Sequence, residues 1–302
     1  MMVILNYIKY KFHRLGFYFY SVKYSCQDKS MNLFKAIVCN LKIFSNRYGY
    51  YEYLEIPITT KCSLRCKNCS NIIPYYKCRG DYDINTLIRS IKIFLKCINN
   101  IVYIRILGGE PFLSDNLKSV ILLLLKSRKV QRIEIVTNGT IVIRDRKLIK
   151  LLQNSKIVVC ISKYSCVDSS KFIDVLVDNS INYRIDDMKY WMDYGKPIRR
   201  ERSERELRRQ FSKCRHICHS LVNGQVHLCP RSSHGTDLGI IKNNGEDYLD
   251  LLDNSMSVDE KRDKLNKLLS RKYIEACRYC IYGTRESRRI KVAEQMDDSF
   301  GR

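Results

Sequence analysis

Short apolar segments alternate with stretches of helical periodicity along the chain from residue 53 onward. The apolar segments are rich in Ile and Val and have the length of buried strands. We predict five strands, at Tyr53–Thr59, Val102–Leu107, Arg132–Thr137, Ile157–Ser162 and Asn182–Ile185. Apolar residues recur at helical spacing between them, as in Ile84, Leu87, Ile88, Ile91 and Phe94 and in Leu117, Val120, Ile121 and Leu124. We predict Ser114 as the N-cap of the second of these helices.

This alternation predicts an α/β fold, because parallel strands need crossover helices between them. Five or six strand–helix units would form a partial or complete barrel, which we describe as a partial (β/α)6-type barrel. In such folds the chemistry takes place at the C-terminal ends of the strands. We therefore expect the functional residues in the loops that follow the strands.

The alternation stops after about residue 194, and the rest of the chain has a different character. Arg and Glu are interleaved over Ile198–Gln210, which favours a solvated, salt-bridged helix, with a phosphate clamp as the alternative. Asn223-Gly224 indicates a tight β-hairpin. We predict three parts: a basic, aromatic-rich extension at 1–49 with one amphipathic helix at Asn32–Phe44, the barrel at 50–200, and a small cysteine-rich α+β domain at 201–302.

Composition narrows the class of protein. The chain has 302 residues, of which 45% are hydrophobic, as in globular proteins. Its formal charge of +23 would suit a nucleic-acid partner, but abundant Lys, Ile, Asn and Tyr match an AT-rich coding bias, and we do not predict such a partner. No apolar run is long enough to span a bilayer. We predict a cytoplasmic protein, in which residues 1–49 pack on the barrel or, alternatively, touch a membrane surface.

Three of the fourteen cysteines follow the first strand at close spacing: Cys62, Cys66 and Cys69. In a reducing compartment, clustered cysteines bind metals or carry out redox chemistry more often than they form disulfides. Three thiolates can hold three irons of a four-iron cubane and leave the fourth iron open to a small molecule. The alternative is a structural zinc site that combines Cys66 and Cys69 with the Cys277–Cys280 pair.

The spacing of this triad resembles that of the radical S-adenosylmethionine (SAM) superfamily, and motifs at three later strand ends resemble it too. These are Gly108-Gly109-Glu110-Pro111, Thr137-Asn138-Gly139-Thr140 and Ser162-Lys163. The resemblance implies a [4Fe-4S] cluster on the triad, with SAM bound by Gly108, Gly109, Glu110, Pro111, Thr137, Asn138, Ser162 and Lys163. Glycines allow close backbone approach to a ligand, and a carboxylate suits the ammonium group of SAM. Asn68 departs from the family, which usually has an aromatic residue there.

A second group of cysteines lies in the C-terminal part: Cys214, Cys229, Cys277 and Cys280. The spacing of Cys214, Gly224 and Cys229 resembles the start of SPASM and twitch domains, which implies an auxiliary [4Fe-4S] cluster of the shorter, twitch type. A four-cysteine zinc site is the alternative. Three roles are open for Cys218. It could replace Cys214 as a ligand, act in catalysis as a hydrogen-atom donor, or be a buried thiol.

The resemblance implies an enzyme that cleaves SAM reductively to a 5′-deoxyadenosyl radical, which abstracts hydrogen from a substrate. Oxidation of a sugar or aminocyclitol is our first expectation, and peptide or protein maturation is the alternative. Such an enzyme needs an electron donor such as flavodoxin or ferredoxin. A competing class is a non-catalytic, zinc-stapled protein that binds nucleic acid.

Overall fold

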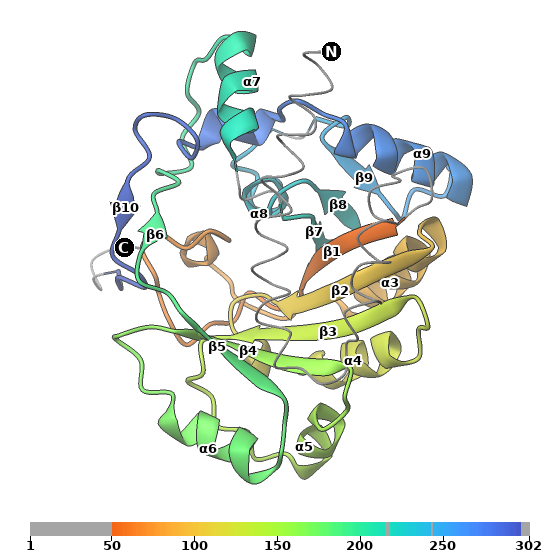
Figure 1. The fold of residues 1–302 in the computed structure, drawn as a ribbon. Coiled ribbons are helices and arrows are strands. Elements are labelled where there is room, and N and C mark those ends of the chain that lie inside the picture. Colours follow the sequence, from red (N-terminus) through yellow and green to blue (C-terminus); the bar gives the residue numbers. More distant parts are fainter. Residues whose placement is uncertain (1–49, 215–217, 243, 297–302) are drawn as a thin grey trace, which may run out of the picture. The chain divides into compact units, whose positions relative to one another are not determined.

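The computed structural model describes residues 50–214, 218–242 and 244–296 (Figure 1). The predicted extension at residues 1–49 and its helix at Asn32–Phe44 lie outside these residues. Tyr51–Arg302 form one compact unit. Among the helices of the described ranges, none is long and apolar enough to cross a membrane.

An eight-stranded, mostly parallel sheet confirms the predicted α/β fold class. The predicted strands are β1 (Tyr50–Pro57), β2 (Asn100–Leu107), β3 (Val130–Thr137), β4 (Ile157–Lys163) and β5 (Tyr183–Asp187). They lie in the order β5-β4-β3-β2-β1, and β2 to β5 pair in parallel. All the strand ends that carry the predicted motifs are thus on neighbouring strands.

The two faces of this sheet differ in chemistry, because successive side chains of a strand point to opposite faces. On β2, Ile104 and Ile106 belong to the hydrophobic core. Tyr103 and Arg105 alternate with them and point to the other face. The apolar face packs against helices, which leaves the polar face to form the inside of the partial barrel.

Four helices connect the parallel strands: α3 (Ile84–Cys97), α4 (Leu117–Leu125), α5 (Arg146–Leu152) and α6 (Ser170–Asp178). In α3, Leu87, Ile91 and Phe94 are buried as the periodicity predicts, and the Asp83 side chain caps the helix by accepting from the Thr86 N–H at 2.7 Å. The predicted N-cap of α4 is wrong. Asn116 holds that position, because Pro111 starts a separate 3-10 turn, η3 (Pro111–Leu113), and Ser114 ends this turn.

The C-terminal part extends the same sheet. Its elements are α7 (Glu204–Lys213), β7 (Ser220–Val222), β8 (Gln225–His227), α8 (Pro230–Asp237), β9 (Tyr248–Asp250), α9 (Val258–Leu269) and the 3-10 helix η4 (Glu275–Tyr279). β7 pairs in parallel with β1, and β8 and β9 continue antiparallel. The sheet therefore runs across residue 200, and the predicted domain boundaries stay a prediction.

Two local predictions for this part are confirmed. Asn223 and Gly224 form the two-residue turn between β7 and β8, with φ angles of 46° and 83°, the left-handed values that a type I′ hairpin turn needs. The charge-dense segment contains α7, which has a capping box at Ser203 and an ion pair between Arg208 and Glu204 at 2.9 Å.

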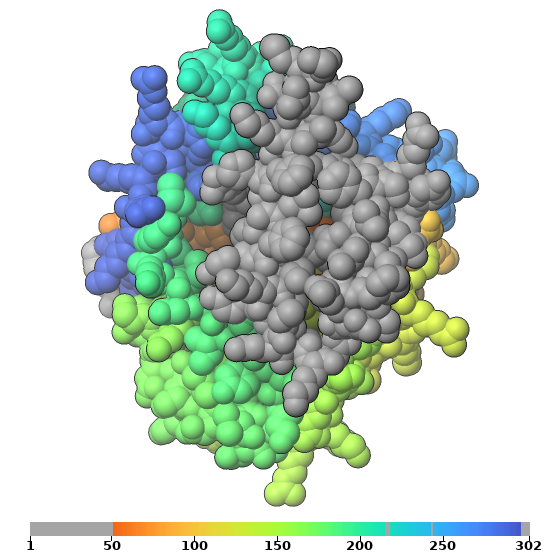
Figure 2. Space-filling model, in the orientation of Figure 1, coloured from red at the N-terminus to blue at the C-terminus, as the bar shows by residue number. Residues whose placement is uncertain are grey.

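The end of the described chain returns to the barrel. β10 (Arg289–Ile290) pairs antiparallel with β6 (Trp191–Met192) in a separate two-stranded sheet. In the space-filling view the blue C-terminal residues lie beside the green segment that contains β6 (Figure 2). This pairing directs residues 291–296 towards the loop that carries the cysteine triad.

Candidate active site

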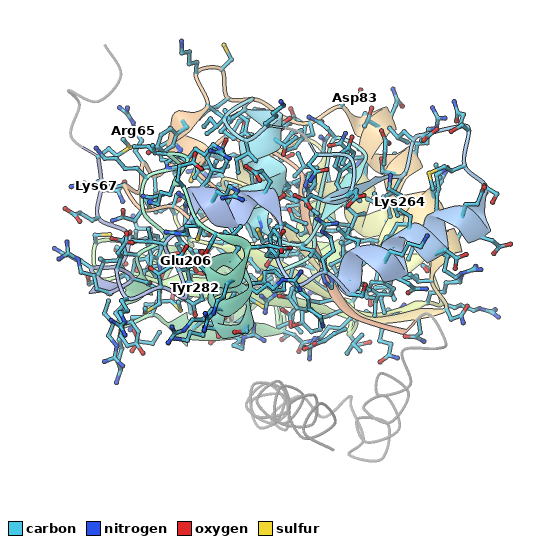
Figure 3. All side chains as sticks on the ribbon, turned by 90° about the horizontal axis from the view of Figure 1, so that it is seen from above. Arg65, Lys67, Asp83, Glu206, Lys264 and Tyr282 are labelled. Carbon is cyan, nitrogen blue, oxygen red and sulfur yellow. The ribbon has the colours of Figure 1, made fainter. Side chains whose placement is uncertain are left out.

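The cysteine triad lies on the loop after β1, as predicted from the sequence. The loop starts at the buried residues Thr59 and Thr60, whose hydroxyl groups both bond to the Gly80 carbonyl oxygen at 3.1 Å. From there the loop turns outward, so that Arg65 and Lys67 lie at one edge of the molecule (Figure 3).

Backbone and side-chain N–H groups face the sulfur atoms of the triad. The Leu64 N–H lies 3.5 Å from Cys62 Sγ, and the Gln295 side-chain amide lies 3.4 Å from Cys66 Sγ. Burial, together with the neighbouring cysteines, raises the pKa of Cys62 to about 11 and that of Cys66 to about 12. A metal cation reverses such shifts by stabilising the thiolate, and the N–H groups favour the same charged form. The triad therefore fits a metal cluster.

The glycines at the end of β2 allow it to pack directly against the triad loop. A Cβ atom on Gly109 would lie 2.1 Å from the Lys61 carbonyl oxygen and 2.9 Å from Cys62 Cβ, and one on Gly108 would lie 2.3 Å from the Thr59 carbonyl oxygen. The sequence-based reason for these glycines was close approach to a ligand. The structure shows that the close approach is to the chain's own loop.

Glu110 is fully buried and joins the ends of β2 and β3. Its carboxylate accepts from the Thr137 hydroxyl at 2.8 Å, from the Asn138 N–H at 2.9 Å and from the Phe112 N–H at 3.2 Å. Burial raises the pKa of Glu110 to about 7, although these three bonds favour the ionised form. The predicted contact of Glu110 with the SAM ammonium group stays a prediction, as does ligand contact by Pro111, which begins η3.

Hydrogen bonds join the turn after β3 to the triad loop. The Asn138 side-chain amide donates to Ser63 Oγ at 3.1 Å and lies 3.9 Å from Cys62 Sγ. The hydroxyl groups of Ser63 and Thr140 are 2.6 Å apart. The sequence indicates Asn138 but not Ser63, because a serine inside a cysteine loop has no distinguishing pattern.

The end of β4 contributes fewer buried side chains to the candidate site than the ends of β2 and β3. Ser162 is half-buried and Lys163 is exposed. The next residue, Tyr164, is half-buried, and burial raises its pKa, to which the three cysteines of the triad add. Its ring also contacts Trp191 edge to face at 5.6 Å. Tyr164 was missed because an aromatic residue after a strand usually indicates packing.

The second group of cysteines comes together from three separate elements. Cys214 ends α7, Cys229 caps α8, Cys277 lies in η4, and Cys280 follows η4. Burial raises the pKa of Cys229 and Cys277, and the other thiols of the group raise it further. The Ser232 N–H and the Tyr282 N–H each lie 3.4 Å from a sulfur atom, those of Cys229 and Cys280 respectively.

Arg202 binds the backbone of this second group, a role that the sequence does not indicate. Its guanidinium donates to the carbonyl oxygens of Cys277 at 2.9 Å and Cys280 at 2.6 Å. The Gln210 amide donates to the same two oxygens at 3.2 and 2.9 Å. Cys218 lies apart from these bonds. It is buried, and its thiol interacts with Tyr53 and Glu55 on β1.

A buried charge cluster occupies the polar face of the sheet. Glu134, which is 1% exposed, bonds Arg105 at 2.9 Å and Arg132 at 2.8 Å, and Arg184 lies 3.5 Å away. Burial alone would raise the pKa of Glu134, but the three guanidinium groups outweigh it and lower the pKa to about 2. This cluster joins side chains from β2, β3 and β5 inside the barrel. Each of its residues reads in the sequence as an ordinary polar position of a strand.

Part of the chain matches a known protein family. Residues 56–169 match the model of the Radical SAM superfamily. The matched region contains the triad and all the strand ends described above, and it is similar to radical SAM domains.

Curated relatives share this region. Molybdenum cofactor biosynthesis protein 1 of Dictyostelium discoideum is 33% identical over 112 residues, which is 36% of this chain and 17% of that protein. GTP 3′,8-cyclase of Aquifex aeolicus is 27% identical over 137 residues, 43% of this chain and 40% of the relative. The chain thus spans less than half the length of these relatives.

Solved structures with partial similarity cover more of the chain. The structure of anSMEcpe with bound AdoMet and the Cp18Cys peptide has a TM-score of 0.47 at 14% identity, covering 76% of this chain and 82% of that one. BtrN in complex with AdoMet and 2-DOIA has a TM-score of 0.44 at 18% identity, covering 76% and 92%.

Proposed function

We propose that the chain binds a [4Fe-4S] cluster through Cys62, Cys66 and Cys69 and cleaves SAM there. When bound, the reduced cluster and SAM together supply a 5′-deoxyadenosyl radical that removes a hydrogen atom from a substrate. The observation that carries the proposal is the packing of the triad loop against the glycines of β2 and the amide of Asn138. This packing fixes the start of the loop, from Thr59 to Ser63, which includes the first cysteine of the triad.

The chain's own residues hold and shield the cofactors. Glu110 fixes the turn after β3 through its bonds to Thr137 and Asn138, and so sets the separation of two ligand-binding strand ends. We propose that SAM lies across these ends, against Gly108–Pro111, Thr137, Asn138, Ser162 and Lys163. Tyr164, which is half-buried, then adds an aromatic side chain beside the triad that helps to exclude water from the reacting atoms.

We further propose an auxiliary [4Fe-4S] cluster on Cys214, Cys229, Cys277 and Cys280. Two N–H groups that face sulfur atoms and the guanidinium of Arg202 behind the loop favour four thiolates here. A cubane spreads its thiolates over four irons, whereas one zinc ion draws them together. The spacing of Cys214, Gly224 and Cys229, which resembles that of twitch domains, favours a cluster over a four-cysteine zinc site.

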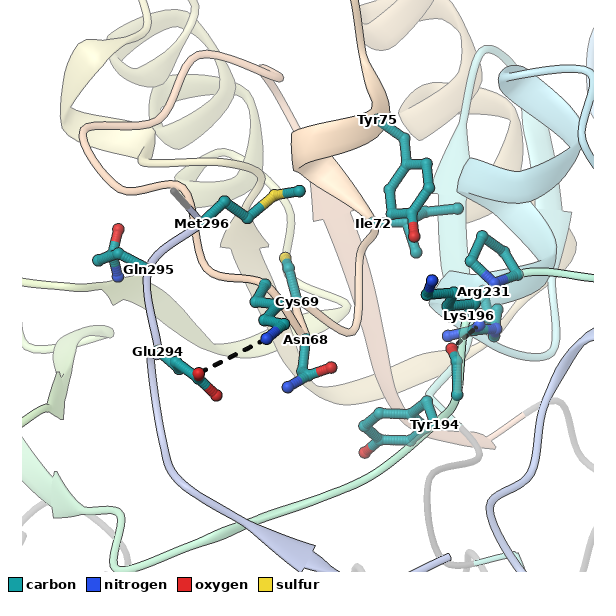
Figure 4. Close-up of a pocket in the computed structure, with 13 residues that line it drawn as sticks. Asn68, Cys69, Ile72, Tyr75, Tyr194, Lys196, Arg231, Glu294, Gln295 and Met296 are labelled. Carbon is teal, nitrogen blue, oxygen red and sulfur yellow. Dashed lines mark hydrogen bonds and ion pairs between the residues drawn. The ribbon is translucent and has the colours of Figure 1, made fainter. Parts of the chain in front are cut away.

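For the substrate we propose a small molecule, with oxidation of a sugar or aminocyclitol as the reaction. A cavity of about 310 Å³ lies beside Cys69, lined among others by Tyr75, Tyr194, Lys196 and Arg231 (Figure 4). This volume is within the range of small-molecule sites. Flavodoxin or ferredoxin is the proposed electron donor.

Anaerobic reconstitution followed by iron and sulfide analysis tests the proposal. We expect about eight irons per chain, from two four-iron clusters. Replacing the three triad cysteines by alanine should remove about half of this iron and abolish 5′-deoxyadenosine formation. Replacing Cys78 instead, an exposed cysteine outside both groups, should leave iron and activity unchanged. Zinc without iron, or wild-type SAM cleavage by the triad variant, would overturn the proposal.

A further inference from the structure

The last described residues of the chain bind to the backbone of the triad loop. The Lys67 N–H donates to the Glu294 carbonyl oxygen at 2.7 Å, and the Met296 N–H donates to the Arg65 carbonyl oxygen at 2.8 Å. Cys66 and Gln295 pair between these bonds as an antiparallel bridge. In Figure 4 the segment with Glu294, Gln295 and Met296 passes alongside Cys69 and Asn68. The C-terminal segment thus adds a short strand to the loop.

The side chain of Gln295 turns back towards Cys66 in this pairing. Its Oε1 accepts from the Arg65 N–H at 2.7 Å, and its Nε2 donates to the Ala293 carbonyl oxygen at 2.6 Å. Both partners are main-chain groups whose roles as donor and acceptor are fixed. The amide therefore has only one orientation, in which Nε2 faces Cys66 Sγ at 3.4 Å.

The segment is also held at a point away from the triad loop. The pairing of β10 with β6 holds it on one side, and the Arg289 guanidinium lies over the Tyr190 ring at 4.2 Å. The Lys67–Glu294 ion pair at 3.6 Å adds little, because both side chains are largely exposed. The main chain, not this ion pair, places the amide at the sulfur.

Hydrogen bonds to the cysteine sulfurs are one of the means by which a protein sets the potential of an iron–sulfur cluster. A donor stabilises the more negative, reduced state more than the oxidised state. It therefore raises the reduction potential, and a cluster that must be reduced before SAM is cleaved gains a larger reduced fraction.

We propose that Gln295 is a positioning residue that donates a hydrogen bond to Cys66 and raises the reduction potential of the triad cluster. This inference rests on the proposed cluster at Cys62, Cys66 and Cys69. It assigns a role in the N-terminal cysteine site to a residue from the far end of the chain.

The test is an EPR-monitored redox titration of the reconstituted full chain. For Gln295→Leu we expect the ratio of reduced to oxidised triad cluster at a fixed potential to fall by roughly three- to tenfold, because only the difference in hydrogen-bond strength between the two states is lost. Gln295→Glu keeps an acceptor for the Arg65 N–H but removes the amide donor, and should lower the ratio at least as much. Glu294→Gln removes only the exposed ion pair and should match the wild type.

An unchanged ratio in either Gln295 variant with full iron content would overturn the inference. An equal fall in Glu294→Gln would also overturn it, because docking of the segment would then matter rather than the amide. The inference would also be overturned if both Gln295 variants, but not Glu294→Gln, lost the triad iron, since the amide would then only hold the loop in place. Absence of triad iron from the wild type would instead refute the proposed function.

Discussion

Replacing Gly109 by alanine tests how closely the triad loop must pack on β2. The new Cβ would lie 2.1 Å from the Lys61 carbonyl oxygen, which is more than 1 Å inside the 3.4 Å at which ordinary contact begins. Backbone atoms cannot rotate away as a side chain does, so the loop must move. Overpacking of this kind costs about 1–3 kcal/mol. Because Cys62 directly follows Lys61, we expect the shift to misplace a ligand of the cluster.

The assay combines urea unfolding of the apoprotein with iron analysis after reconstitution. Gly109→Ala should lower the free energy of unfolding by about 1–3 kcal/mol and bind less triad iron. Gly245→Ala is the matched control, because nothing lies within 4 Å of its Cβ position. Wild-type stability and iron content in Gly109→Ala would refute the reasoning, since the loop would then be free to shift.

Three further predictions concern the buried charges and the second group of cysteines. Glu134→Gln should destabilise the protein by about 3 kcal/mol at neutral pH, because it leaves buried guanidinium groups without their carboxylate. Because the pKa of Glu134 is lowered in the folded state, the ionised carboxylate stabilises the fold above pH 4.5, and this stability is lost as the pH falls towards 2. The free energy of unfolding of Glu134→Gln should therefore fall less between pH 4.5 and pH 2 than that of the wild type. An equal fall in the two proteins would contradict the assignment. Replacing Cys277 and Cys280 by alanine should remove about half of the iron and keep the triad EPR signal, whereas full iron content would exclude an auxiliary cluster on these residues. Arg202→Met should loosen the Cys277–Cys280 loop and speed loss of auxiliary iron to a chelator, compared with an Arg208→Met control on the exposed face of α7.

The sequence predicts the fold and the cysteine loop well because the signals for both lie in residues that are close together in the chain. Alternating apolar segments specify strands, and Asn223-Gly224 specifies its turn through the left-handed conformation that both residues tolerate. The cysteine triad is recognisable because its three residues lie within one loop. The one wrong local prediction, the Ser114 cap, arose where a proline began an unexpected 3-10 turn.

The residues that support the two cysteine groups and the barrel cannot be predicted from the sequence, because their partners are distant in the chain. Gln295 is an isolated polar residue until the chain folds it against Cys66. Arg202 belongs to a run of charges that is typical of a solvated surface, yet it bonds two carbonyl oxygens beside the second cysteine group. Glu134 is one charged position of a strand in the sequence. Arg132 lies on the same strand, but Arg105 and Arg184 reach Glu134 from β2 and β5 only when the sheet forms.

The central claim is that Cys62, Cys66 and Cys69 leave one iron of a cluster open to SAM. The most direct measurement is the EPR spectrum of the reduced triad cluster, recorded with and without SAM in a variant that lacks Cys277 and Cys280. The account predicts a signal whose g-values change when SAM is added, because SAM binds the open iron. A signal that is identical with and without SAM would contradict it.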